Sequence, residues 1–285
     1  MRRPPSPVAQ RSGAEGARAS LTHEPVGFRK MKHVIMFSGG IGSWATAKRV
    51  AEKHGTADLV LLFADTRAED EDLYRFINEA ARNVGAPLTT IADGRTPWEV
   101  MRDARIIGNS RIDPCSKILK RQLLGRWRNK HCDPEATIIY IGIDWSEEHR
   151  IQTVRSRTHP WRYEAPMCEP PHLTKVQMME WAESEGIRPP RLYDLGFNHN
   201  NCGGACIKAG QAQWALLWRT FPERYLKIEK WEEEMRACVG EHSILRDRSG
   251  GTSKPLTLRA FRARLEAQQS FDANDWGGCG CALPT

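Results

Sequence analysis

The sequence predicts an α/β fold, a twisted parallel sheet with helices on both faces that is followed by a helical C-terminal region. Short apolar runs alternate with segments of helical periodicity in the first half of the chain, which is typical of βαβ units. A glycine-rich turn at residues 38–42 joins the first run to the first helix, and from about residue 173 onward the pattern becomes helical. In such sheets ligands bind at the carboxyl ends of the strands.

The expected elements follow from these patterns in chain order. The apolar run at residues 33–37 predicts the first strand, and apolar residues at helical spacing predict a helix over about 43–54. The run at 138–143 is apolar throughout and predicts a strand that is buried on both faces. Further strands are expected at 59–64 and 88–91, and further helices around 73–81, 117–127, 176–185, 208–218, 222–238 and 258–268.

Length and composition bound the organisation of the chain. With 285 residues, 40% of them apolar, the chain can bury one sizeable core or one core with a smaller appendage. We expect a flexible tail over 1–30, a nucleotide-binding α/β domain over 31–200, and a helical region over 201–285 with a cysteine-rich segment and a Gly-Cys tail. No apolar run approaches the ~20 residues that span a bilayer. We therefore expect a cytoplasmic protein without a membrane partner.

The formal net charge is +7, from 42 basic and 35 acidic residues. This excess is compatible with a nucleic-acid partner or with binding of anionic nucleotides. Solvated surface charge is the plainer interpretation, because part of the excess lies in the N-terminal tail.

The turn after the first strand has the character of an anion site. Its glycines let backbone N–H groups converge on an anion, and the helix that follows adds a favourable dipole. Ser38 and Ser43 supply hydroxyl donors. The turn lacks the Lys-Ser/Thr ending of a Walker loop, which argues against an ordinary P-loop NTPase. A turn that serves packing alone has the same local pattern.

Five segments carry a resemblance to a known family. Residues 38–43 resemble the S-G-G-x-D-S signature of the PP-loop superfamily, and residues 63–74 resemble an Asp-Thr-Gly segment with a downstream Thr-Tyr. Residues 114–120 are similar to a cysteine followed by a basic helix, residues 142–150 fall where the family has T-G-x-R…R, and residues 192–206 resemble L-Y-D-x-G-Y…G-C-x-x-C. The set looks most like the phosphoadenosine phosphosulfate (or adenylyl sulfate) reductase branch.

This resemblance implies an adenine nucleotide alpha hydrolase-like fold that binds ATP or an adenylyl sulfonucleotide. Two departures bear on the substrate. Gly42 replaces the Asp of the signature, a carboxylate that engages magnesium in ATP-cleaving members, and Asp144 stands where an Arg is expected to hold an anionic group. The nucleotide contacts that the resemblance implies are Ser38, Gly39, Gly40, Gly42, Ser43, Asp65, Thr66 and Arg150.

Three of the eight cysteines form a candidate metal site. Cys202 and Cys206 share a face if their segment is one helical turn, and lysines near Cys115 favour its thiolate. In cluster-bearing members of the family, tandem cysteines at the first place and C-x-x-C at the second hold a [4Fe–4S] cube. Here one cysteine stands at the first place and three residues separate the later pair, so a fourth ligand is missing. A zinc site and unligated core cysteines remain alternatives.

The C-terminal Gly-Cys-Gly-Cys tail contains Cys279 and Cys281, which are candidates for the fourth ligand or for a mobile nucleophile. The family carries its catalytic cysteine on a tail with the motif E-C-G-L-H, where it forms an enzyme–thiosulfonate intermediate. The present tail is not that motif. An enzyme of this kind needs a thioredoxin-like or other thiol donor to resolve its intermediate.

Three functions remain open from the sequence. The first is a sulfonucleotide-reductase-like enzyme with thiol and iron–sulfur chemistry. The second is an ATP pyrophosphatase that adenylates a nucleic acid for thiolation or phosphorothioation; the basic charge and Asp144 favour it, and Gly42 weakens it. The third is a nucleotide-binding or nucleic-acid-binding subunit without catalytic activity.

Overall fold

The computed structural model describes Met1 and residues 30–248 and 251–278 of the chain. Its centre is a five-stranded sheet in the order β3-β2-β1-β4-β5, and every neighbouring pair of strands is parallel. The predicted α/β fold with a parallel sheet is therefore confirmed. The strands are β1 (Lys32–Met36), β2 (Leu59–Asp65), β3 (Leu88–Ala92), β4 (Thr137–Tyr140) and β5 (Arg162–Glu164).

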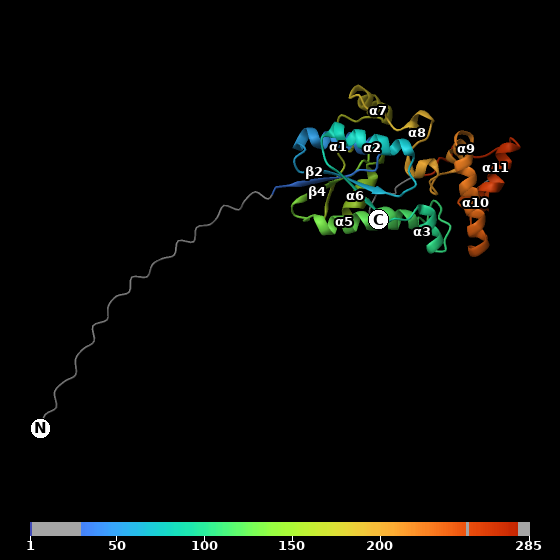
Figure 1. Ribbon diagram of the computed structural model, residues 1–285, viewed down its shortest axis with the longest axis horizontal. Helices are drawn as coiled ribbons and strands as arrows, with labels where there is room; N and C mark the ends of the chain where they lie inside the picture. Colours follow the sequence, from blue (N-terminus) through green and yellow to red (C-terminus); the bar gives the residue numbers. More distant parts are fainter. Residues whose placement is uncertain (2–29, 249–250, 279–285) are drawn as a thin grey trace.

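Helices cover both faces of the sheet (Figure 1). One face packs against α1 (Ile41–His54), α2 (Glu71–Val84) and α7 (Lys175–Ser184), and the other against α5 (Leu123–His131) and α6 (His149–Thr158). Successive strand residues enter opposite layers: Ile35 belongs to the first apolar cluster and Val34 to the second. This burial on both sides explains why β1 has a continuous apolar sequence.

Two elements of the sheet region were missed from the sequence, and one is shorter than predicted. The strand β5 has only three residues, and α6 is mostly polar with few buried apolar positions. The strand β4 ends at Tyr140 although the apolar run continues to Ile143. The chain leaves the regular ladder there because residues 142–147 turn across the carboxyl end of the sheet.

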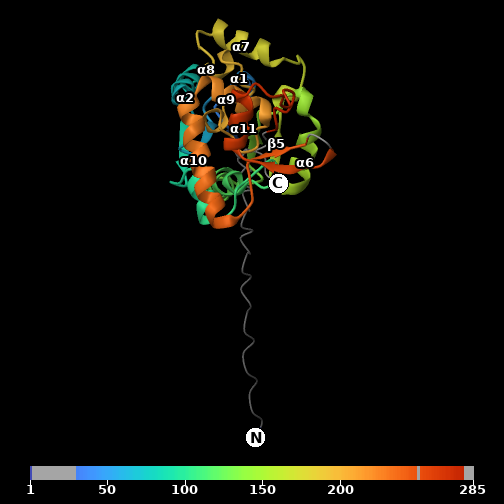
Figure 2. The same cartoon turned by 90° about the vertical axis from the view of Figure 1, so that its right-hand side faces the viewer.

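A second core lies at one end of the sheet, seen at the right of Figure 1 and facing the viewer in Figure 2. It joins α9 (Gln211–Thr220), α10 (Pro222–Val239) and α11 (Leu258–Glu266) to α3 (Pro97–Asp103). Trp214 of α9 is fully buried in this core. The antiparallel pair β6 (Leu245–Asp247) and β7 (Lys254–Leu256) packs alongside.

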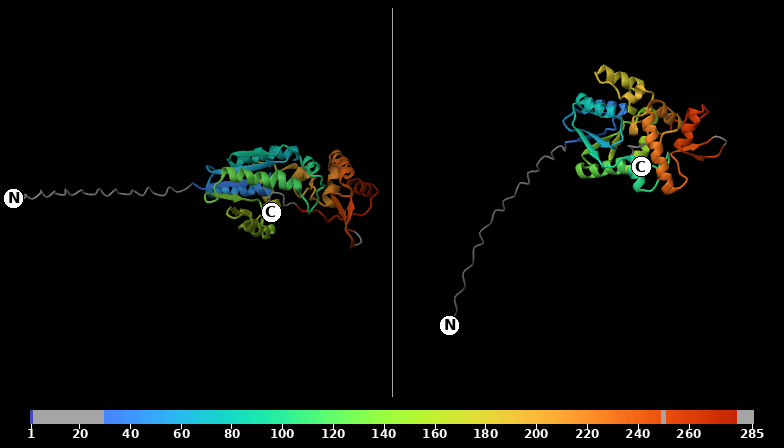
Figure 3. Two further views of the ribbon diagram at one scale, coloured as in Figure 1. Left: turned by 90° about the horizontal axis from the view of Figure 1, so that it is seen from below. Right: turned by 45° about the vertical axis from the view of Figure 1, so that its right-hand side comes forward.

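The remaining elements are short and lie near the carboxyl ends of the strands. The two views of Figure 3 show the C-terminal helices at this end of the molecule. In the part of the chain that the structure describes, no helix combines the length and apolarity needed to cross a bilayer. The short elements are α4 (Pro114–Ser116), the π-helical turn η1 (Lys117–Gln122), η2 (Trp145–Glu147), η3 (Pro166–Cys168), α8 (Arg191–Asp194) and η4 (Asn201–Gly204).

Candidate functional site

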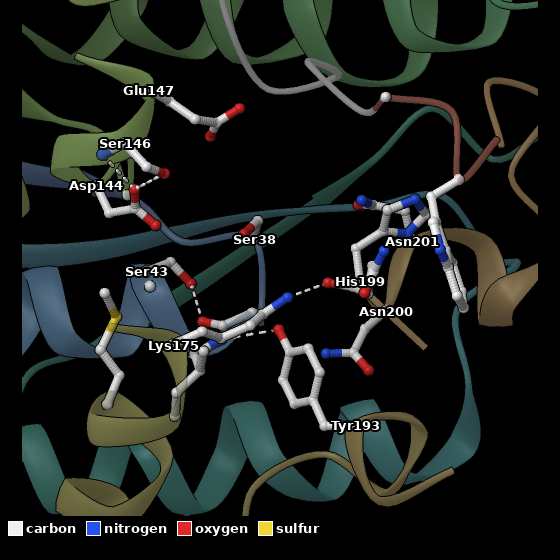
Figure 4. Close-up of a pocket in the computed structure, with 18 of the residues that line it drawn as sticks. Ser38, Ser43, Asp144, Ser146, Glu147, Lys175, Tyr193, His199, Asn200 and Asn201 are labelled. Atoms are coloured by element: carbon white, nitrogen blue, oxygen red, sulfur yellow. Dashed lines mark hydrogen bonds between the residues drawn. The ribbon is translucent and has the colours of Figure 1, made fainter. Parts of the chain in front are cut away.

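A cavity of about 400 Å³ lies at the carboxyl ends of β1 and β4. Its floor is the glycine turn that leads into α1. Figure 4 shows Asp144, Ser146 and Glu147 on one side and His199, Asn200 and Asn201 on the other. The other lining residues come from the turn (Ser38, Gly40, Ile41, Gly42, Ser43), from Gly142, from α7 and the segment after it (Lys175, Met178, Tyr193, Asn198), and from the C-terminal residues 276–278.

The glycine turn has a conformation that its sequence imposes. Gly39 has φ +78°, and a Cβ there would lie 2.9 Å from side-chain atoms of both Leu73 and Ile77 on α2. Gly40 is the N-cap of α1, so the first N–H groups of the helix point toward the cavity end of the turn. The N–H of Ile41 donates to the Tyr193 hydroxyl at 3.3 Å. The turn therefore presents a helix N-terminus to the cavity, as an anion site requires.

Gly42 lies against a second glycine from the loop after β4. A Cβ on Gly42 would be 3.0 Å from the Gly142 carbonyl oxygen, and a Cβ on Gly142 would be 2.8 Å from the Ser43 nitrogen. The two backbones therefore cross at a distance that leaves little space for a side chain on either residue. This close crossing gives a physical reason for the glycine that stands in place of the signature Asp.

The structure places four of the eight expected nucleotide contacts, Ser38, Gly40, Gly42 and Ser43, on the cavity wall. The hydroxyl of Ser43 donates to the Gly40 carbonyl at 2.7 Å, and the residue is 2% exposed, so its side chain stabilises the turn. Gly39 packs on α2 and is not among the lining residues.

The other three expected contacts lie elsewhere. The Asp65 carboxylate accepts hydrogen bonds from the Tyr74 hydroxyl at 2.7 Å and from the Arg67 N–H at 2.8 Å. Thr66 is buried and lines a second cavity, described below. Arg150 pairs with Glu147, so it reaches the first cavity only through that carboxylate.

The charged side chains that line the cavity are two carboxylates and one ammonium group. Asp144 accepts hydrogen bonds from the Ser146 N–H at 2.9 Å and the Ser146 hydroxyl at 2.5 Å, and both reach the same oxygen. The Lys175 ammonium donates to the Asn198 carbonyl and lies 4.8 Å from the centre of the Tyr193 ring (Figure 4). The balance of charge at this end is therefore negative, apart from the helix dipole of α1.

The wall opposite Asp144 was missed from the sequence. It consists of four consecutive polar residues, Asn198 to Asn201, and Asn200 is only 5% exposed. The one signal in the sequence is that these four polar residues follow each other directly between two apolar segments. Lys175 and Trp276 were also missed, because each enters the cavity through folding of segments far from the glycine turn.

Cys115, Cys202 and Cys206, the three expected metal ligands, line one small second cavity of about 20 Å³. They come from α4 and from the segment around η4. Cys202 has φ +53°, and Gly203 and Gly204 are also left-handed, so the segment is a tight irregular turn. The helical turn that would have set the two later cysteines on one face is not formed there.

A buried carboxylate holds the Cys202 turn. Glu69, with a side chain 2% exposed, accepts the Cys202 N–H at 2.8 Å and the Thr66 hydroxyl at 3.0 Å, and pairs with Lys120 at 3.5 Å. A hydrogen bond with Cys206 would lower the pKa of the Cys202 thiol. Burial and the Glu69 carboxylate outweigh it, so the pKa of Cys202 lies above its ordinary value.

The donor chemistry of this cavity fits a metal–thiolate centre, because three soft sulfur ligands surround it. Its volume admits about one water-sized group, so a four-iron cube needs the three side chains to move apart. Among residues 30–248 and 251–278, no set of three or more His, Cys, Asp or Glu side chains is already arranged around a metal position. Cys279 and Cys281, the expected tail nucleophile or fourth ligand, lie outside the described residues.

Comparisons with known proteins find a likeness to solved structures but no match in sequence. No protein-family model and no curated protein matches the sequence. Among solved structures, the chain aligns with phosphoadenylyl-sulfate (PAPS) reductase from Candida auris, a phosphate complex, at 15% identity and TM-score 0.43, over 61% of this chain and 81% of that one.

A second solved structure is the U34-tRNA thiolase NcsA from Methanococcus maripaludis with its [4Fe-4S] cluster. It aligns at 14% identity and TM-score 0.42, over 73% of each chain. Both neighbours are PP-loop superfamily proteins. At these identities and TM-scores the likeness assigns no role to any residue of this chain.

Proposed function

We propose that this protein is a PP-loop-type enzyme that binds an adenine nucleotide in the larger cavity and couples it to sulfur chemistry at the cysteine cavity. The placement of the two cavities carries the proposal. The N-terminus of α1 opens into the first, and three thiols line the second. Asn201 lines the nucleotide cavity and its neighbour Cys202 lines the cysteine cavity, so the two chambers share one stretch of backbone.

The charges in the nucleotide cavity favour ATP with Mg²⁺ over a bare sulfonucleotide. Mg²⁺ in nucleotide sites is held by one or two carboxylates together with the phosphates, and Asp144 and Glu147 are such a pair. A sulfate group without a cation would meet both carboxylates, and the opposing positive groups are Lys175, the N-terminus of α1, and Arg150, which is already paired with Glu147. We therefore infer that the chain acts as an ATP pyrophosphatase that adenylates an acceptor for sulfur insertion. Its net charge of +7 suits a nucleic-acid acceptor.

The reaction we infer is attack of an acceptor oxygen on the α-phosphorus of ATP. The acceptor O–P bond forms, the bond between the α-phosphorus and its bridging oxygen breaks, and pyrophosphate leaves. The N-terminal amides of α1 orient the phosphates, and the Lys175 ammonium offsets the charge that develops on them. Asp144 and Glu147 would hold the cation that accompanies the nucleotide.

The cysteine cavity is the proposed site of the sulfur step. Cys115, Cys202 and Cys206 would hold an iron–sulfur cluster there, and such a cluster would supply electrons or a bound sulfur atom. Lys120 and Lys208 line the same cavity, where they pair with Glu69 and Asp113, and their positive charge also favours thiolates. Zinc is the competing metal, because the same donors bind it.

A second candidate reaction is reduction of a sulfonucleotide. Gly278, which precedes Cys279, lines the nucleotide cavity, and this favours a tail thiol as nucleophile. A thiolate of Cys279 or Cys281 would attack the sulfonate sulfur and release the nucleotide. Two thiols of a donor such as thioredoxin would then release sulfite and leave as their disulfide, so the donor supplies both electrons.

One pair of assays on the full chain separates these reactions. Pyrophosphate release from ATP and Mg²⁺ in the presence of RNA or DNA supports adenylation, and sulfite release from a sulfonucleotide with a dithiol donor supports reduction. Lys175→Ala should reduce the supported activity at least tenfold, whereas Lys227→Ala, on the exposed face of α10, should not change it. If neither product forms and calorimetry detects no nucleotide binding, the proposed function is wrong.

The metal is tested separately. Anaerobic purification should give a brown protein with iron and sulfide, and the visible absorption should disappear in Cys202→Ser but not in Cys238→Ser, an exposed cysteine. A colourless protein that contains zinc would show that the site binds zinc and not a cluster, and the proposed nucleotide site would be unaffected.

A further inference from the structure

The C-terminal segment 272–278, called the strap below, docks against residues 208–212, and its residues 276–278 line the nucleotide cavity. Asp275 fastens it: its carbonyl accepts the Ala212 N–H at 2.9 Å, and its carboxylate accepts the Gln211 N–H at 3.4 Å. Further along, Gly277 makes an antiparallel bridge with Ala209. Beyond these bonds, Trp276 and Gly277 line the cavity itself.

Two glycines make this docking possible. A Cβ on Gly210 would lie 2.2 Å from the Asp275 carbonyl oxygen, and a Cβ on Gly277 would lie 2.3 Å from the Lys208 carbonyl oxygen. Gly277 also has φ +69°, a conformation that other residues adopt only at a cost. The close contact therefore requires glycine on both sides, and the sequence has glycine at both positions.

We propose that the strap completes the nucleotide site and that Trp276 is a binding residue for the nucleotide, through contact of its indole with the bound molecule. This inference rests on the proposed function, because it needs a nucleotide in the cavity. The indole is half-buried, and it belongs to the only aromatic residue that the strap brings to the cavity in the described range 272–278. An aromatic face suits a purine base, since every base has a π-face on which it can stack.

The strap forms its part of the cavity wall without belonging to a helix or a strand. The strap is held by hydrogen bonds to residues 208–212 and by an ion pair between Asp275 and Arg248, and none of its side chains is fully buried. Its detachment should therefore cost less free energy than the unfolding of a core element. A nucleotide that contacts Trp276 binds the docked state better than the detached one. Binding should therefore hold the strap in place.

The test is titration calorimetry of the full chain with ATP and Mg²⁺, using paired variants. Trp276→Ala should weaken binding about tenfold or more, and Trp276→Phe, which keeps an aromatic face, should stay within about threefold. Gly277→Ala should match Trp276→Ala because its Cβ prevents docking. Gly240→Ala is the control: it has φ +84° but open space around its Cβ, and it should bind as the wild type does.

Hydrogen exchange on the wild-type chain gives a readout that does not depend on a variant. Amides of 275–278 should exchange more slowly with ATP and Mg²⁺ than without. If the wild type binds ATP but Trp276→Ala binds within twofold of it and exchange in the strap is unchanged, the inference is overturned and the nucleotide site remains. If the wild type does not bind ATP at all, the proposed function fails first.

Discussion

Glu232 gives the sharpest test of the energetics of this fold. Its carboxylate is fully buried in the second core, where it accepts the backbone N–H groups of Ile244 at 2.8 Å and Leu258 at 2.6 Å. Burial raises the pKa of Glu232 from 4.5 to about 7, and the two hydrogen bonds only partly oppose the rise. The group thus ties α10 to β6 and α11 while it holds a proton more tightly than it does in the unfolded chain.

The sign of the effect follows from that difference. Between pH 4.5 and about 7 the folded chain binds more protons at Glu232 than the unfolded chain does, so the free energy of unfolding falls as the pH rises through this window. The contribution is fully present below pH 4.5 and is lost above about pH 7. The gap between the two pKa values corresponds to roughly 3 kcal/mol.

The assay is urea unfolding of the wild type and Glu232→Gln at several pH values from 4.5 to 8. The variant cannot titrate, so its stability should lack about 3 kcal/mol of the decline that the wild type shows. The pKa of His33 is lowered by burial and by His54, so it acts in the opposite direction, but it is common to both proteins and cancels in the difference. Parallel pH profiles for the two proteins would refute the reasoning.

Two further outcomes follow from buried contacts. Gly42→Ala should lower the free energy of unfolding by about 1–3 kcal/mol despite a gain in helix propensity, because its Cβ meets the Gly142 carbonyl. The control Gly125→Ala on α5 places its Cβ in open space and should be neutral or stabilising. Denaturant unfolding curves measure both, and equal effects of the two substitutions would contradict the close crossing. Asp70→Ala should lower the free energy of unfolding by about 2 kcal/mol in the same assay, because it leaves Arg191 and Arg224 without their buried carboxylate. Asp58→Ala, which breaks a more exposed ion pair with Lys30, is the control, and an equal or larger loss in that variant would contradict the prediction.

The sheet was predictable because its signals are local. The apolar run of β1, the glycine turn and the periodicity of α1 are neighbours in sequence, and each agrees with the others. The strand β5 and the helix α6 gave little signal, since three residues and a mostly polar helix fall below what periodicity can detect. Their placement depends on the rest of the sheet.

The candidate site was predictable only in part. The turn residues that line the first cavity could be predicted from their position after β1. The three cysteines do meet in one cavity, but their spacing in the sequence does not by itself require this. Trp276 and Lys175 enter the same cavity from the end of the chain and from α7. Their approach is a product of tertiary packing, which no local pattern encodes.

Asn201 lines the first cavity and the next residue, Cys202, lines the second, and the N–H of the peptide unit that joins them donates to Glu69. A shift of the backbone at this unit would change the shape of both cavities. We expect a ligand in the first cavity to change the exposure of the Cys202 thiol, because the two residues are adjacent in the chain. The rate at which Cys202 reacts with a thiol reagent should therefore differ between the protein with a ligand in the first cavity and the protein without one.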